Sequence, residues 1–209
     1  MMTPYMGKLY TEDEITEVLE NYNNKITFKK CKNVYEAAAI SITKNLIIGW
    51  FQDRSECGPR ALGNRSIIVD PRKASMKDYL NERVKFREGF RPYAPAILWE
   101  YQKEYFDLDI PSPYMLMVAD ILPEKRSIIP AVTHVDGTGR IQTVMRELNY
   151  KFYNLIEAFY LITGVPVLLN TSFNVQGEPI VESPEDAIKC FLKTNIDELY
   201  IHNYIIKKI

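Results

Sequence analysis

One segment, residues 54–70 (RSECGPRALGNRSIIVD), constrains the fold of this chain most, because it joins two apolar runs through a loop rich in glycine, proline and arginine. The runs at residues 46–51 and 66–69 have the length and apolar character of buried strands. Gly58-Pro59 and Gly63-Asn64 are turn signals, and glycine lets the backbone approach a ligand that a β-carbon would exclude. We therefore expect a polar loop at the end of a buried sheet.

The arginines of this loop favour an anion site. Arg60 and Arg65 flank the tight segment 61–63, so two guanidinium groups can converge on one oxyanion with bidentate geometry. A solvated surface loop is the alternative, and it would be the better interpretation of a lone arginine. Residues 54–91 contain ten Lys and Arg against five Asp and Glu, whereas the whole chain has a formal net charge of -1. A local excess in a balanced chain favours a small, highly charged anion over a general nucleic-acid or membrane partner.

Size and cysteine usage indicate the setting. The chain has 209 residues, enough for one domain with a substantial core. Its three cysteines, Cys31, Cys57 and Cys190, form no CxxC pair and fit a reducing cytosol. No apolar run reaches the roughly 18 residues of a membrane span, and no signal-peptide core is evident at the N-terminus. We expect a cytoplasmic protein.

Helical and strand patterns alternate along the chain. Thr11 with Glu14, Ser75 with Asp78, and Ser183 before Pro184 are helix-start signals. Helices are expected at residues 12–22, from 33 through 40, from 75 to about 85, at 148–161 and after 183. Strands are expected at residues 46–51, 66–69, 94–98, 114–119, 165–169 and 198–206, with a hairpin over 133–144. This order implies an α/β or α+β fold, a sheet with helical cover and ligands at the strand exits.

Four polar segments at strand exits, GPRALGNRS, VKFREGFRPYAP, HVDGTGRIQTV and LLNTSFNVQGEPIV, closely resemble the C-terminal domain of the NodU-type carbamoyltransferases in the same order. The resemblance implies a YrdC-like fold: a twisted, mixed parallel and antiparallel sheet covered by helices. Members of the family also carry an N-terminal domain of actin-like ATPase fold. The resemblance implies that residues 1–209 are the second domain alone, with an actin-like domain as partner.

The resemblance also implies a function. The domain would bind carbamoyl phosphate and ATP, with Mg²⁺ held chiefly through the nucleotide phosphates, and form a carbamoyladenylate for O-carbamoylation of an acceptor. Carried onto this sequence, the family's phosphate- and nucleotide-handling residues are Arg60, Lys85, Arg140 and Ser172, of which we expect Lys85, Arg60 and Ser172 to be catalytic. Asn170, beside Ser172, is a further substrate-binding candidate, and Arg65, Arg87 and Arg91 are candidates of second rank. No residues at metal-ligand spacing are found, and His134 is interpreted as structural.

The assigned side chains suit phosphate chemistry, in which cationic groups and hydrogen-bond donors stabilise developing negative charge. Each also has a plainer interpretation. Lys85 would favour a helix C-terminus, Arg140 would suit a solvated hairpin, and Ser172 would suit a turn. The family commonly has an aromatic residue where Cys57 stands, and there we expect a small buried side chain.

Two other functions remain open at this stage. The first is a nucleotide- or anion-binding module that acts only with a separate partner domain. The second is an RNA-binding protein of YrdC-like fold. RNA binding predicts steeply salt-dependent affinity, and the near-neutral net charge makes it the weakest of the three hypotheses.

Overall fold

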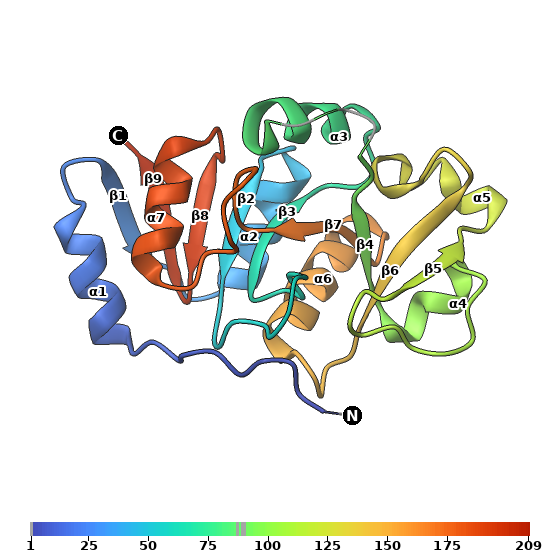
Figure 1. Ribbon diagram of the computed structural model, residues 1–209, viewed down its shortest axis with the longest axis horizontal. Helices are drawn as coiled ribbons and strands as arrows, with labels where there is room; N and C mark the ends of the chain where they lie inside the picture. Colours follow the sequence, from blue (N-terminus) through green and yellow to red (C-terminus); the bar gives the residue numbers. More distant parts are fainter. Residues whose placement is uncertain (1, 87, 89–90) are drawn as a thin grey trace.

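In the computed structural model, residues 2–86, 88 and 91–209 are described. Within them, nine strands form one mixed sheet in the order β1-β9-β8-β2-β3-β7-β4-β6-β5 (Figure 1). The strands are β1 (Ile26–Lys30), β2 (Ile48–Phe51), β3 (Arg65–Val69), β4 (Ala94–Leu98), β5 (Met117–Asp120), β6 (Thr138–Val144), β7 (Val167–Ser172), β8 (Glu198–Ile201) and β9 (Tyr204–Lys208). The pairs β2–β8 and β4–β6 are parallel and the others antiparallel, which confirms the mixed sheet.

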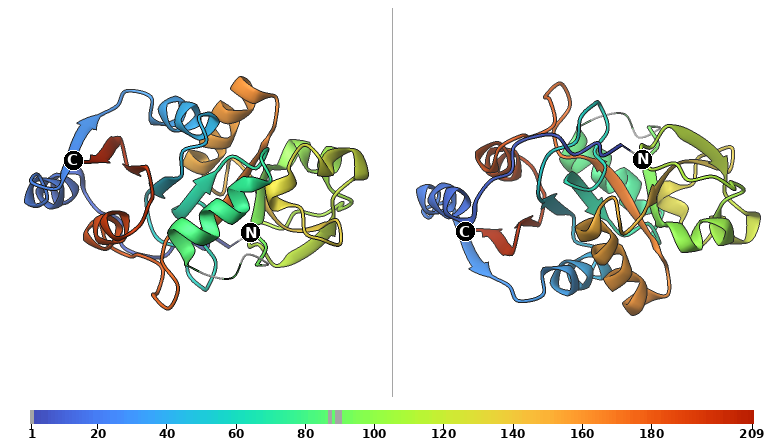
Figure 2. Two further views of the ribbon diagram at one scale, coloured as in Figure 1. Left: turned by 90° about the horizontal axis from the view of Figure 1, so that it is seen from above. Right: turned by 90° about the horizontal axis from the view of Figure 1, so that it is seen from below.

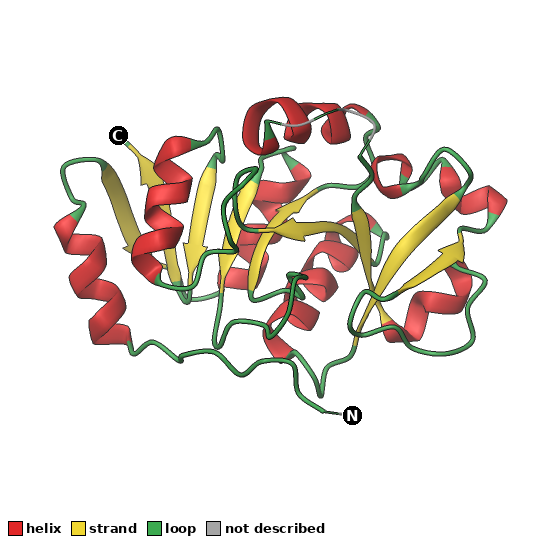
Figure 3. Cartoon of the chain, viewed as in Figure 1, coloured by secondary structure: helices red, strands yellow, loops and turns green. Residues whose placement is uncertain are grey.

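Helices cover both faces of this sheet, as the cartoon in Figure 3 shows. They are α1 (Glu12–Asn21), α2 (Val34–Thr43), α3 (Ser75–Leu80) with the π-helical turn η1 (Asn81–Lys85), α4 (Gln102–Tyr105), α5 (Pro123–Arg126), α6 (Tyr150–Thr163) and α7 (Pro184–Lys193), with 3₁₀ turns η2 (Trp99–Tyr101) and η3 (Pro130–Val132). In Figure 2, α2 and α6 lie on one face, and α3, α7 and the amino-terminal segment lie on the other. No helix among the described residues is long and apolar enough to cross a membrane.

Local capping signals set the starts of the longer helices. Thr11 and Glu14 form a reciprocal capping box at α1, and Ser183 and Asp186 form another at α7. Helix α6 starts at the Asn149 cap and ends at Gly164, whose φ of 72° is left-handed. The expected Ser75 cap is wrong: Ser75 is the first residue of α3, and the preceding Ala74 makes no side-chain cap.

Two of the predicted strand arrangements are wrong, and one strand has no counterpart among the predictions. The hairpin over residues 133–144 is wrong, because the residues before Gly137 form a turn and β6 pairs with β5 and β4 instead. The expected final strand is two strands, β8 and β9, which turn at His202 with φ 46°. The sequence does not predict strand β1, because ITFKK is short and three of its five side chains are polar and exposed.

Strand β7 starts and ends later than its apolar run predicts. It extends through Ser172, so Asn170 and Ser172 lie within the strand rather than in a turn after it. Asn170 pairs with Ile68 of β3 on one side and Ala94 of β4 on the other. Residues two apart on a strand share a face. The sheet therefore presents both polar side chains on one surface.

Candidate functional site

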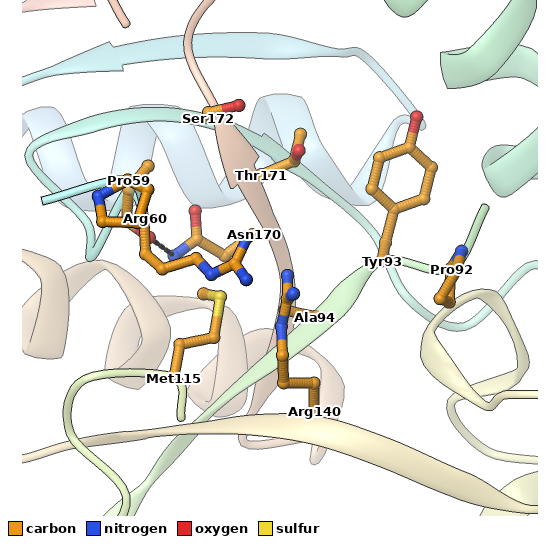
Figure 4. A pocket seen from close by; sticks show the side chains of 11 residues that line it. Pro59, Arg60, Pro92, Tyr93, Ala94, Met115, Arg140, Asn170, Thr171 and Ser172 are labelled. Carbon is orange, nitrogen blue, oxygen red and sulfur yellow. Dashed lines mark hydrogen bonds between the residues drawn. The ribbon is translucent and has the colours of Figure 1, made fainter. Parts of the chain in front are cut away.

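A small cavity of about 100 Å³ lies where the four polar segments meet (Figure 4). Its lining residues are Pro59, Arg60, Ala61, Pro92, Tyr93, Ala94, Met115, Arg140, Asn170, Thr171 and Ser172. They come from the glycine-rich loop, the start of β4, the segment before β5, and strands β6 and β7. Four predicted site residues, Arg60, Arg140, Asn170 and Ser172, are thus brought together from distant parts of the sequence.

The cavity is cationic. Arg60 is exposed on the loop and Arg140 is half-buried on β6, and in Figure 4 their guanidinium groups converge from these two elements. None of the described lining residues is acidic. Two forked cations facing one small space favour a planar or tetrahedral oxyanion between them.

Asn170 forms the floor of the site at 1% exposure. Its Nδ2 donates to the Ala61 carbonyl at 3.1 Å and to Gln142 Oε1 at 2.7 Å. Its Oδ1 has no hydrogen-bond partner among the described residues. A buried acceptor without a partner is costly, so this oxygen is suited to receive a donor from a bound molecule. Sequence reasoning missed Gln142, whose only signal was its polar character within a strand.

Lys85 contacts the site through Ser172. It ends η1 at 3% exposure and does not line the cavity. Its Nζ donates to the carbonyl oxygen of Ser172, to Ser172 Oγ at 3.3 Å, and to the Asn174 carbonyl and Oδ1 at 3.0 and 2.9 Å. Ser172 Oγ in turn donates to Asn174 Oδ1 at 2.7 Å. The position is buried, so Lys85 is not simply a solvated cation at a helix end.

The structure places Arg65 outside this cavity. Its side chain is fully buried, stacks 3.5 Å from the Phe51 ring centroid, and donates to the carbonyls of Gln52, Asp53, Asn64 and Glu182. Burial lowers the pKa of Arg65 to about 10. The guanidinium is committed to main-chain oxygens, and we do not carry Arg65 into the proposed site.

The other described candidates do not line the cavity. Arg91 is exposed and pairs with Glu88 at 3.1 Å, while Arg87 lies outside the described residues. Cys57 is exposed, which corrects the expectation of a buried side chain. His134 Nδ1 lies 3.0 Å from Thr138 Oγ1 in the turn before β6, as a structural histidine would. No group of three or more His, Cys, Asp or Glu in the described part of the chain is arranged to hold a metal ion.

The fold has counterparts among solved proteins. P. abyssi Sua5 complexed with L-threonine superposes with a TM-score of 0.58 at 16% identity, over 79% of this chain and 45% of that one. Full-length HypF in its phosphate- and nucleotide-bound form gives a TM-score of 0.53 at 19% identity, over 82% of this chain and 21% of that one. These matches define the class of protein as a YrdC-like α/β domain, which confirms the expected fold.

Sequence comparison then gives the family. The family model described as Carbamoyltransferase C-terminus matches residues 39–208, and the chain belongs to this family. Nodulation protein NolNO of Sinorhizobium fredii is 47% identical over 96% of this chain, and nodulation protein NolO of Bradyrhizobium diazoefficiens is 42% identical over 98%. The chain spans only 30% and 38% of these two relatives.

Proposed function

We propose that this domain binds carbamoyl phosphate and ATP and forms a carbamoyladenylate, as one half of an O-carbamoyltransferase. The observation that carries the proposal is the cavity in which Arg60 and Arg140 converge beside Ser172, with no acidic side chain among its described lining residues. Membership of the carbamoyltransferase C-terminal family supports it. So does the likeness in fold to HypF, which was solved with phosphate and nucleotide bound.

The chemistry asks for what these side chains offer. In the proposed reaction, water first hydrolyses carbamoyl phosphate to carbamate and inorganic phosphate. A carbamate oxygen then attacks the α-phosphorus of ATP, and the bond from that phosphorus to the departing pyrophosphate breaks. Negative charge grows on the phosphate oxygens, so positioning and electrostatic stabilisation supply most of the catalysis. In our proposal Arg60 and Arg140 bind those oxygens. Ser172 donates a hydrogen bond to the substrate, and Lys85 fixes Ser172 in position.

Asn170 has a separate role in this proposal. A carbamoyl group carries an NH₂, and the Asn170 Oδ1 is a buried acceptor at the cavity wall. Accepting from that NH₂ would orient the carbamoyl group and satisfy the oxygen at the same time. Mg²⁺, if it takes part, would arrive with the nucleotide phosphates, because such ions bind substrate phosphates more readily than all-protein cages.

The acceptor hydroxyl would be supplied elsewhere. The chain spans 30% and 38% of the two relatives, and we propose that an actin-like N-terminal domain in their remaining sequence binds the acceptor. The alternative is a nucleotide- or anion-binding module that acts only with a separate partner domain, and the two arginines of the cavity would serve such a module as well. We find no observation that favours RNA binding.

Pyrophosphate release tests the proposal. The chain is incubated with ATP, carbamoyl phosphate and Mg²⁺, and Arg60→Ala and Arg140→Ala are compared with Arg146→Ala. Arg146 is a matched control because it is exposed and pairs with Glu157 outside the cavity. We expect losses of roughly 10²–10³-fold in the two cavity variants and little change in the control. ATP binding by calorimetry without pyrophosphate release would support the binding-module alternative.

A further inference from the structure

The backbone of the Arg60 loop is held by side chains that do not touch the cavity. The Leu62 carbonyl accepts from Tyr5 Oη at 3.0 Å, from Gln142 Nε2 at 2.9 Å and from Asn149 Nδ2 at 3.4 Å. Asn149 Nδ2 also donates to Tyr5 Oη at 3.0 Å, so these groups form one connected network. Three donors on one carbonyl fix the peptide two residues after Arg60.

Glu56 binds backbone N–H groups of the same loop. Its Oε1 accepts from the backbone N–H groups of Leu62 and Asn64, each at 2.7 Å, and from that of Arg65 at 3.3 Å. Burial raises the pKa of this carboxyl, whereas the backbone donors favour its charged form. A carboxylate that gathers several main-chain N–H groups imposes one conformation on the turn around it.

The amino-terminal segment completes this arrangement. Tyr5 pairs with Glu56 in an isolated antiparallel bridge, the Pro4 carbonyl accepts from Cys57 N at 2.7 Å, and Gly7 N donates to the Ser55 carbonyl at 3.1 Å. A β-carbon on Gly7 would lie 1.8 Å from Ser55 Oγ, so the two segments are in direct contact. The segment thus delivers the Tyr5 hydroxyl to Leu62 and braces the start of the loop.

We propose that Tyr5 and Glu56 are positioning residues for Arg60. Neither lines the cavity, and both fix the backbone from which Arg60 extends. A long arginine side chain on a rigid loop loses less freedom when it grips an anion than one on a mobile loop, so fixing the loop raises affinity. The effect on affinity rests on the proposed function, whereas the effect on the loop does not.

The test uses the full chain with two measurements. Amide hydrogen exchange by NMR follows Leu62, Asn64 and Arg65, with amides of β7 and α6 as internal references. Calorimetry measures ATP affinity with Mg²⁺. Tyr5→Phe removes the hydroxyl that donates to the loop, and Tyr22→Phe is its matched control because the Tyr22 hydroxyl donates to Glu185 Oε1 instead, at 3.3 Å. Glu56→Ala removes the carboxylate, and Glu56→Gln restores an acceptor oxygen.

We expect exchange at the three loop amides to accelerate about fivefold to tenfold in Tyr5→Phe, with the reference amides unchanged. Affinity for ATP should fall by a similar factor, and Tyr22→Phe should match the wild type. Glu56→Ala should show a larger effect that Glu56→Gln partly rescues. If Glu56→Ala does not fold, the Tyr5→Phe comparison decides.

The inference is overturned if loop exchange in Tyr5→Phe is unchanged, or if it rises only together with the reference amides. It is also overturned if the loop loosens while ATP affinity stays at the wild-type value. A wild type that binds no ATP would refute the proposed function. In that case the exchange measurement alone would still decide whether Tyr5 and Glu56 hold the loop.

Discussion

Lys85 donates to both oxygens of Ser172, the main-chain carbonyl and the side-chain hydroxyl, from a position that solvent barely reaches. The last residue of β7 is therefore held by a buried ammonium group. Since Ser172 lines the cavity, the positive charge of Lys85 acts on the site through the residue it holds. Removing that charge should affect both folding and binding.

Lys85→Met is expected to lower the free energy of unfolding by about 2–3 kcal/mol, because the carbonyls of Ser172 and Asn174 lose a charged donor. Pyrophosphate release should fall by about 100-fold or more. Lys73→Met, at an exposed position before the same helix, should change neither quantity. Urea unfolding and a pyrophosphate assay check this prediction, and a Lys85→Met variant of wild-type stability and activity would contradict it.

Arg65→Ala should act on stability far more than on binding. Four main-chain carbonyls lose their donor and a large buried side chain is deleted, so we expect a loss of about 3–5 kcal/mol. Arg65→Lys keeps the charge but not the planar guanidinium, so its free energy of unfolding should lie between those of the wild type and Arg65→Ala. Urea unfolding gives the stability, and calorimetry on the folded fraction gives ATP affinity. The prediction fails if affinity collapses while stability is retained.

Two glycines of the arginine loop separate backbone strain from steric clash. Gly63 has φ +104°, and a β-carbon there would lie 2.2 Å from the Phe152 ring, whereas Gly58 has φ +113° with open space around it. Gly58→Ala should cost about 1–3 kcal/mol from backbone strain alone. Gly63→Ala should cost a further 1–3 kcal/mol, roughly, from overpacking. Thermal unfolding of both variants tests this order, and equal costs would show that the clash is relieved cheaply.

His202 should make stability fall in mild acid. Burial, and then the charge of Lys151, lower its pKa from 6.5 to about 4. The unfolded chain binds the proton more readily, so the contribution is complete above pH 6.5 and is lost as pH falls toward 4. The loss is at most about 3 kcal/mol, and less where solvent reaches the ring. His202→Asn, which tolerates the positive φ, should flatten this part of the curve measured by urea unfolding at several pH values.

Local chemistry explains what the sequence could predict. The capping boxes at Thr11 and Ser183 and the glycine stop at Gly164 involve residues within one turn of each other, and they set helix ends as expected. The failed hairpin at 133–144 and the divided final strand depend on which strands meet across the sheet. No short-range pattern carries that information.

The candidate site, like the fold, could be predicted only in part. Arg60, Arg140, Asn170 and Ser172 were identified by residue type near strand ends and by family resemblance, and they do converge. Arg65 is of the same type and only five residues from Arg60, yet it turns inward. Its direction depends on carbonyls of Gln52, Asp53 and Glu182, whose convergence exists only in the folded chain.

The hydrogen bonds that frame the cavity also bear on how the protein would behave during folding. Gln142 reaches Leu62 across 80 residues of sequence, and Asn170 reaches Ala61 across 109. Contacts so remote along the chain form only after large loops close, so they belong to the slow, cooperative part of assembly. A partly assembled chain would have no cavity, and any ligand of the cavity would raise the midpoint of thermal unfolding of the entire domain in proportion to the logarithm of its concentration. The fraction of chains that bind the ligand therefore reports the fraction that is completely folded.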